Sequence, residues 1–213
     1  MNLLVIAFIV VIVLVGYGLT LLLDVALTAE ERLFYGAVVG VMVVSVVGFG
    51  FAWWAGMSRG TIVAASLASL GLSGPGWWRR PQRILDDWRD VGSRLATPVR
   101  TPGNPLPLIV ITLISVVAAW RILGLAYGTT DDGGVSVGHL STFGDWSAHL
   151  AYAASFAYAD NFPPELPTAA GESFAYHFGI DWFSAMFVPL GLSLQGSLQL
   201  SSGILAVAFP GVM

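Results

Sequence analysis

Long uncharged stretches recur along this 213-residue chain and predict helices that cross a membrane. Leu3–Leu23 carries no charge and ends at Asp24, and Phe34–Met57 is a second such stretch. Leu106–Tyr127 is a third, with a single charge at Arg121, close enough to its end for the side chain to reach the membrane surface. Each stretch holds the roughly 20 apolar residues that are needed to cross a hydrocarbon core about 30 Å thick. We therefore predict a span at each of the three.

Three other segments are apolar but less regular. Gly60–Trp78 has a short apolar part rich in Ala and Ser, so it either spans or lies against the membrane, and the side of the N-terminus depends on which. Phe174–Leu192 is a candidate fifth span, and Leu198–Val212 begins a sixth that is short for a crossing. We expect an all-α polytopic transmembrane protein with five or six spans. We also expect it to be a fragment of a longer protein, rather than a chain whose last helix is completed by a partner.

The composition agrees with a membrane protein. Hydrophobic residues make up 56% of the chain and charged residues 10%, whereas a soluble domain carries roughly a quarter charged residues. The low polarity, the absence of cysteine and the formal charge of −4 exclude a disordered chain, a disulfide scaffold and a nucleic-acid binder. Glycines at 36, 40, 48 and 50 predict positions where the second span packs closely on another helix.

The distribution of charge predicts the orientation. Six of the nine basic residues lie between Arg79 and Arg100, and none follows Arg121. The loop 128–172 holds six acids instead. Because positive loops stay on the cytoplasmic side, we expect a multi-pass protein of the cell membrane with the basic loop inside and loop 128–172 outside.

The basic loop contains a helical pattern of its own. Apolar residues recur at helical spacing opposite a charged side, with the members Ile84, Leu85, Trp88, Val91 and Leu95. Asp90 and Arg94 also stand four residues apart, which gives a weak stabilising pair. The pattern predicts a short amphipathic helix in the inner membrane interface. An ordinary solvated loop helix is the alternative.

The outer loop carries the candidate chemistry. GDWSAHLAYAASFA predicts a helix from about Trp146 to Ala157 that starts at Asp145 and lies parallel to the membrane surface. Asp145 and His149 are four residues apart and so share a face of that helix. His177 and Asp181 repeat the spacing at the mouth of the candidate fifth span.

Each of these residues also has a structural interpretation. Asp145 is a candidate N-cap, and His149 an ordinary interface residue. Asp181 lies in an apolar helix, where an ionisable residue usually faces a cavity or a partner, and His177 is a candidate partner. A zinc or manganese site is a further possibility, with the two Asp and two His as ligands and His139 as an additional candidate. No spacing in the sequence brings the two Asp–His pairs together. The metal assignment stays open.

Together, GDWSAHL, NFPPELP and AGESFAYHFGIDWFSAMF resemble the start of the C-type integral-membrane glycosyltransferases, most closely their uncharacterised bacterial members. The resemblance covers about half of the chain, from Leu106 onward. Together with the predicted spans and the charge distribution, it divides the chain into N-terminal transmembrane helices (1–78), a basic cytoplasmic loop (79–105) and the start of a glycosyltransferase-like membrane domain (106–213), which we expect to be truncated. Several of these families carry a paired acidic motif at the first outer loop, whereas Trp146 follows Asp145 here.

The resemblance implies an enzyme that moves a hexose or pentose from a polyprenyl-phosphate carrier to an acceptor on the outer face. It implies Asp145 as the catalytic carboxylate, and we expect His149, His177 and Asp181 to bind the substrate. The implied partners are the lipid bilayer and a lipid-linked sugar, with a divalent metal possible, and the fragment alone is expected to be inactive. The alternatives are a non-catalytic membrane subunit or scaffold in a larger complex and, ranked last, a transporter segment with His177 and Asp181 as a proton relay.

Overall fold

A computed structural model describes residues 2–23, 25–132, 134–138, 145–169, 171–175 and 177–212. The chain is all-α in class, and 71% of the residues that the structure describes are helical. Its helices are α1 (Leu3–Thr20), α2 (Ala29–Ala55), α3 (Arg59–Arg79), α4 (Pro81–Leu95), α5 (Leu106–Ala126), α6 (Trp146–Ala159), α7 (Gly179–Ala185) and α8 (Leu194–Val212). A short antiparallel hairpin, β1 (Tyr127–Thr129) and β2 (Val135–Val137), follows α5 and was not predicted.

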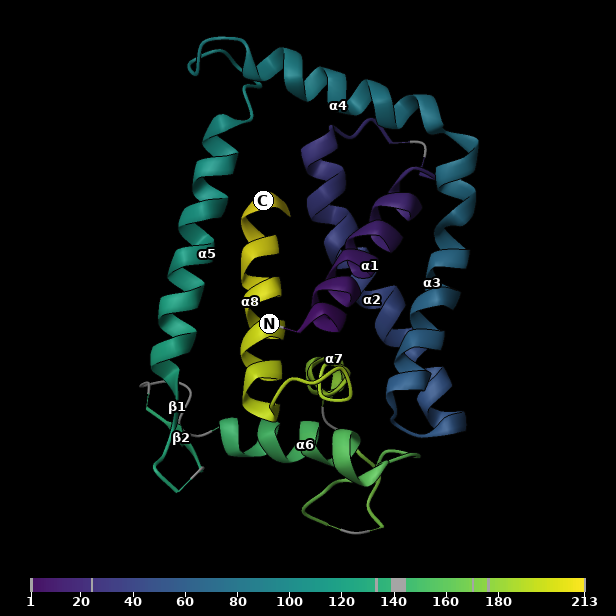
Figure 1. The fold of residues 1–213 in the computed structure, drawn as a ribbon, viewed down its shortest axis with the longest axis vertical. Coiled ribbons are helices and arrows are strands. Elements are labelled where there is room, and N and C mark those ends of the chain that lie inside the picture. Colours follow the sequence, from purple (N-terminus) through teal and green to yellow (C-terminus); the bar gives the residue numbers. More distant parts are fainter. Residues whose placement is uncertain are drawn as a thin grey trace.

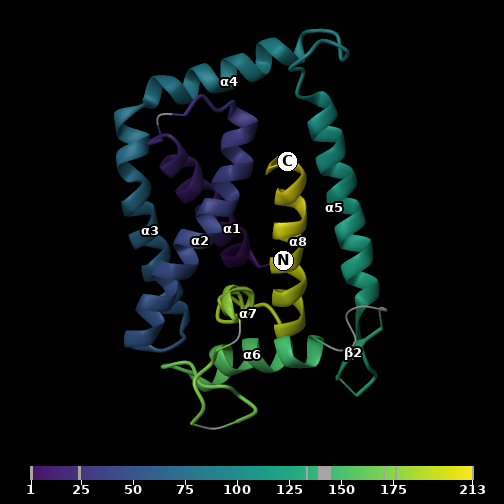
Figure 2. The ribbon, with the colours of Figure 1, turned by 180° about the vertical axis from the view of Figure 1, so that it is seen from behind.

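Most of the long helices run along the long axis of the molecule, and others lie across its ends (Figures 1 and 2). The lengthwise helices are α1, α2, α3, α5 and α8. The helix α4 crosses one end, and α6 crosses the opposite end together with the hairpin and the loop after α6 (Figure 1). The chain therefore passes lengthwise through α1, α2 and α3 before α4, and returns through α5 to the end where α6 lies.

Glycines allow α1 and α2 to pack with their backbones in contact. A Cβ atom added at Gly16 would lie 1.6 Å from the carbonyl oxygen of Gly36, and one at Gly40 would lie 2.0 Å from that of Ile12. Gly48 of the same row faces Met186 of the segment after α7, whereas Gly50 faces open space. The predicted packing role is confirmed for positions 36, 40 and 48 and is wrong for position 50.

Three helices, α1, α2 and α5, are long and apolar enough to cross a membrane. They coincide with the three stretches that the sequence indicated most clearly. The less regular segment Gly60–Trp78 forms α3, a helix of 21 residues that begins at a Ser58 cap and contains Pro75. It lies beside α1 and α2 (Figure 1).

The expected fifth span over Phe174–Leu192 is wrong. Among the described residues of this range, Gly179–Ala185 is the only helix, and its seven residues rise about 10 Å, too little to cross a membrane. Turns follow α7 up to Gly191, whose φ of 103° is in the left-handed region that favours glycine. The segment is apolar because it is packed inside the protein: residues Asp181 to Ala185 are all buried.

Candidate functional site

A cavity of about 240 Å³ lies where α6, α7 and α8 meet. Figure 1 shows that these helices meet at the end of the molecule that α6 crosses. Three of its seven lining residues carry ionisable side chains, and two further ones are an indole and a hydroxyl. The lining residues are Asp145, Trp146, His149, Ile180, Asp181, Leu198 and Ser202.

The helix α6 is held at its C-terminal end by a contact with the turn between α2 and α3. Asp160, which ends α6 with a φ of 47°, accepts a hydrogen bond from the backbone N–H of Met57. Its carboxylate lies against Gly56: a Cβ atom added there would lie 3.2 Å from Oδ1 of Asp160, and the φ of 74° favours glycine. This contact joins positions 103 residues apart and fixes where α6 crosses the bundle.

An aromatic cluster holds α6 and α7 together. Phe156 of α6 is fully buried, and its ring centroid lies 5.7 Å from that of Trp182 of α7 in an edge-to-face arrangement. The indole N–H of Trp182 donates to the carbonyl oxygen of Ser45 in α2 at 2.9 Å. Burial of these rings, with their favourable edge-to-face contacts, positions the start of α7 beneath the cavity.

Asp181 is the buried acid of the site. Its side chain has no exposed surface, and its Oδ1 lies 2.7 Å from Nδ1 of His149. The second oxygen, Oδ2, is buried without a hydrogen-bond partner among the residues that the structure describes. Burial raises the pKa of Asp181 to about 6, and the hydrogen bond and charge of His149 act in the opposite direction. A buried carboxylate oxygen without a hydrogen-bond partner costs stability, and its retention beside a cavity points to a role there.

His149 lines the same cavity and is the partly exposed member of the pair. Its side chain is 22% exposed, and its ring lies between those of Trp146 and Tyr152, with centroid distances of 5.8 and 6.2 Å. A carboxylate on Nδ1 orients the imidazole and directs its chemistry to Nε2. The pair is therefore a preorganised carboxylate–histidine arrangement at a cavity.

Asp145 lines the same cavity from the N-terminal end of α6 and is exposed. Its φ of −90° and ψ of −23° are helical rather than extended, and within the described part of the chain its side chain makes no capping hydrogen bond. The interpretation of Asp145 as a simple N-cap is therefore wrong for this structure. The four-residue spacing does bring Asp145 and His149 to one cavity, as expected.

The expected pairing of His177 with Asp181 is wrong. His177 precedes the first residue of α7, so the two are not on one helical face, and His177 is exposed and outside the cavity lining. Asp181 pairs instead with His149, which is 32 residues away in the sequence. Ser202 and Leu198 complete the cavity from α8 and were not predicted, because nothing local distinguishes them from other residues of an apolar helix.

The structure gives the divalent-metal hypothesis no support. No group of three or more His, Asp or Glu side chains is arranged to hold a metal ion within the described ranges. His139, which was held in reserve for such a site, lies outside those ranges.

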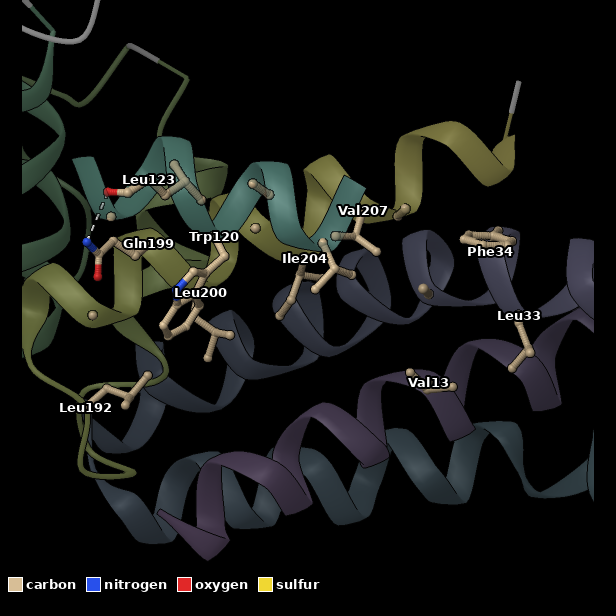
Figure 3. A pocket seen from close by; sticks show the side chains of 17 residues that line it. Val13, Leu33, Phe34, Trp120, Leu123, Leu192, Gln199, Leu200, Ile204 and Val207 are labelled. Carbon is tan, nitrogen blue, oxygen red and sulfur yellow. Dashed lines mark hydrogen bonds between the residues drawn. The ribbon is translucent and has the colours of Figure 1, made fainter. Parts of the chain in front are cut away.

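A second, larger cavity of about 620 Å³ lies between α1, α2, α5 and α8 (Figure 3). Its wall is almost wholly apolar, with Leu33, Trp120 and Ile204 among the side chains that line it (Figure 3). The amide nitrogen of Gln199, a polar group of the wall, donates to the carbonyl oxygen of Leu123 at 3.2 Å. The cavity therefore suits an apolar occupant.

The two cavities share α8 as a wall. Leu198 and Ser202 line the smaller cavity, whereas the next residues along the helix, Gln199 and Gly203, line the larger one.

Comparisons with protein-family models, with curated proteins and with solved structures find no significant match to this chain. The geometry of the two cavities and the sequence motifs are therefore what indicates its function.

Proposed function

We propose that this protein is part of a membrane glycosyltransferase that moves a sugar from a polyprenyl-phosphate carrier to an acceptor hydroxyl on the outer membrane face. The observation that carries the proposal is the cavity that brings Asp145, His149 and Asp181 together from two helices. The resemblance of the motifs around these residues to C-type glycosyltransferases supports the same reaction.

The chemistry assigns Asp145 as the catalytic base. An acceptor hydroxyl is a poor nucleophile, and an exposed carboxylate within hydrogen-bond reach can take its proton as the new bond to the anomeric carbon forms. The bond from that carbon to the phosphate breaks, and the phosphate leaves with the electron pair. His149, oriented by Asp181, is proposed to bind a hydroxyl group of the substrates.

The larger cavity offers a place for the apolar tail of the carrier. Its walls come from α1, α2 and α5, which are apolar enough to lie in a bilayer, and from α8, which also borders the smaller cavity. A lipid-linked sugar could therefore place its tail and its sugar on the two sides of one helix. The chain has no basic residue after Arg121, so we propose that the cations for the carrier phosphate come from a partner or from a further part of the same protein.

The proposed topology follows the charge distribution. The end crossed by α6 is outside, and the end crossed by α4, with its arginines, is cytoplasmic. Asn2 donates to the carbonyl oxygen of Leu190 at 2.9 Å, so α1 begins near the α6 end. The N-terminal end of α1 is then also outside, and α6 lies parallel to the outer membrane surface.

The test is Asp145→Asn in the full-length protein, assayed for sugar transfer from a polyprenyl-phosphate donor and for expression in the membrane. Loss of a general base predicts a fall in rate of about 10²–10⁴-fold with normal expression. Asp131→Asn is the matched control, because Asp131 is an exposed acid of the same loop outside the cavity and should transfer normally. Near-normal transfer by Asp145→Asn would exclude this role and favour a non-catalytic membrane subunit.

A further inference from the structure

The helix α4 is fixed to the bundle by a buried ion pair. Arg32 of α2 is fully buried, and its Nε lies 3.2 Å from Oδ2 of Asp87 of α4. The guanidinium also donates to the carbonyl oxygen of Thr20 at 2.7 Å, and the hydroxyl of Tyr17 donates to the same Asp87 oxygen at 3.1 Å. A buried charge is costly to leave without its partner, so this contact resists separation of α4 from α1 and α2.

A second ion pair holds α4 two turns further on. Nη2 of Arg94 lies 2.8 Å from Oε2 of Glu30 at the start of α2, and Nε of Arg94 lies 2.8 Å from Asp90. Asp87 and Arg94 are seven residues apart and lie on one face of the helix. Two contacts on one face fix the rotation of α4 about its own axis.

This rotation leaves the apolar side of α4 uncovered. Leu85, Trp88 and Leu95 are 51%, 50% and 43% exposed, at spacings that place them along one side of the helix. Trp78, near the end of α3 just before α4, is 88% exposed. Half-exposed large apolar side chains along one side of a surface helix indicate a partner or a membrane.

The charged residues of α4 and its flanks indicate which class of partner covers the apolar side. Asp87 forms an ion pair with Arg32, and Asp90 forms one with Arg94. The exposed arginines near α4 are Arg79, Arg89 and Arg100. Among the residues that the structure describes, the ion pair of Arg89 is a loose contact with Asp86, at 3.6 Å between two exposed side chains. The surface that remains combines arginines with Trp and Leu, which is the composition that binds an anionic lipid surface.

We propose that α4 binds anionic phospholipid headgroups of the membrane leaflet at the end of the bundle that it crosses. Leu85, Trp88 and Leu95 enter the interface, and Arg79, Arg89 and Arg100 contact lipid phosphates. The position of α4 favours lipid over a protein partner, because it crosses the bundle at the level where α2 and α5, both apolar enough to span, begin (Figure 1). This inference does not depend on the proposed enzymatic function.

Spin labels on single cysteines test the insertion, because the chain has no cysteine of its own. The whole chain is reconstituted in nanodiscs with a label at Leu85→Cys or Leu95→Cys, and Ser93→Cys is the control on the charged side. We expect the first two labels to be more accessible to oxygen than to a water-soluble nickel chelate, and Ser93 to show the reverse. A Leu85 label as accessible to the chelate as Ser93 would overturn the proposal, as would a label shielded from both reagents, which would indicate a protein partner.

The lipid class is tested in nanodiscs of mixed phosphatidylglycerol and phosphatidylcholine, with native mass spectrometry to count the lipids that stay bound. We expect the wild-type chain to retain phosphatidylglycerol preferentially, and Arg79→Gln/Arg89→Gln/Arg100→Gln to lose that preference. Arg121→Gln in α5 is the matched control and should keep it. A wild-type chain without preference, or a triple variant that retains it, would show that these arginines do not bind anionic lipid.

Discussion

Asp181 is an ionisable residue of the candidate site that is fully buried. Its carboxylate has lost all contact with solvent, has one hydrogen-bonded partner in His149, and keeps a second oxygen without a partner in the described part of the chain. Burial without full compensation favours the neutral form of a carboxyl group, which is why its pKa rises to about 6. Its stability contribution should therefore depend on pH.

Asp181→Asn should reveal this dependence. The folded pKa of about 6 lies above the ordinary value of 3.8, so the folded state takes up a proton as pH falls through this window before the unfolded state does. Relative to the Asn variant, the wild-type protein should gain thermal stability as pH falls from above 6 toward 3.8, and lose it again as pH rises. Thermal unfolding of both proteins in detergent across this window measures the difference. A difference that stays constant with pH would contradict a raised pKa at Asp181.

At the scale of elements, the contact between α1 and α2 depends on missing side chains. Gly16, Gly36 and Gly40 let the two backbones approach more closely than any Cβ would permit. Small residues perform this role between helices in membranes, where there is little hydrophobic gain from pairing two apolar helices and close packing supplies the attraction.

Gly16→Ala should therefore destabilise the protein. Its Cβ would lie 1.6 Å from the Gly36 oxygen, so α1 must move away from α2, at a cost of about 1–3 kcal/mol for overpacking. Gly50→Ala is the matched control, because a Cβ there meets nothing within 4 Å, and it should leave stability nearly unchanged. Thermal unfolding in detergent compares the two variants. Equal stability of the Gly16 and Gly50 variants would show that the close approach is not required.

At the scale of the whole molecule, the two ends differ in charge and in chemistry. The end crossed by α4 holds the cluster of arginines, and the opposite end holds the hairpin, α6 and the cavity with Asp145 (Figures 1 and 2). Lengthwise apolar helices separate the two ends. The difference predicts that each end faces its own side of a membrane.

Cysteine labelling with an impermeant reagent in intact cells checks this topology. Ser136→Cys in β2 should be labelled, because the hairpin is proposed to be outside. Ser93→Cys in α4 should be labelled only after the cells are opened. Both serines are exposed in the structure, so a lack of labelling would report the membrane rather than burial. Labelling of Ser93 alone in intact cells would invert the topology and remove the basis for an outer-face transferase.

The sequence alone determined the features that depend on neighbours along the chain. The apolar stretches that form α1, α2 and α5, the amphipathic pattern of α4 and the helix that follows Asp145 were all predicted, because local periodicity and length decide them. Asp181 was also predicted as a candidate site residue, because an acid is unusual within an apolar segment.

Only the tertiary structure decided which of these residues meet. His149 pairs with Asp181 across 32 positions, and Ser202 reaches the same cavity from α8, contacts that no local spacing encodes. An apolar run such as Phe174–Leu192 satisfies the composition of a span and of a buried segment equally well. The surrounding aromatic rings and the contact of Trp182 with Ser45 in α2 made it a buried seven-residue helix with turns. Burial is a property of the whole fold, because the atoms that exclude water from one segment belong to segments far away in the sequence.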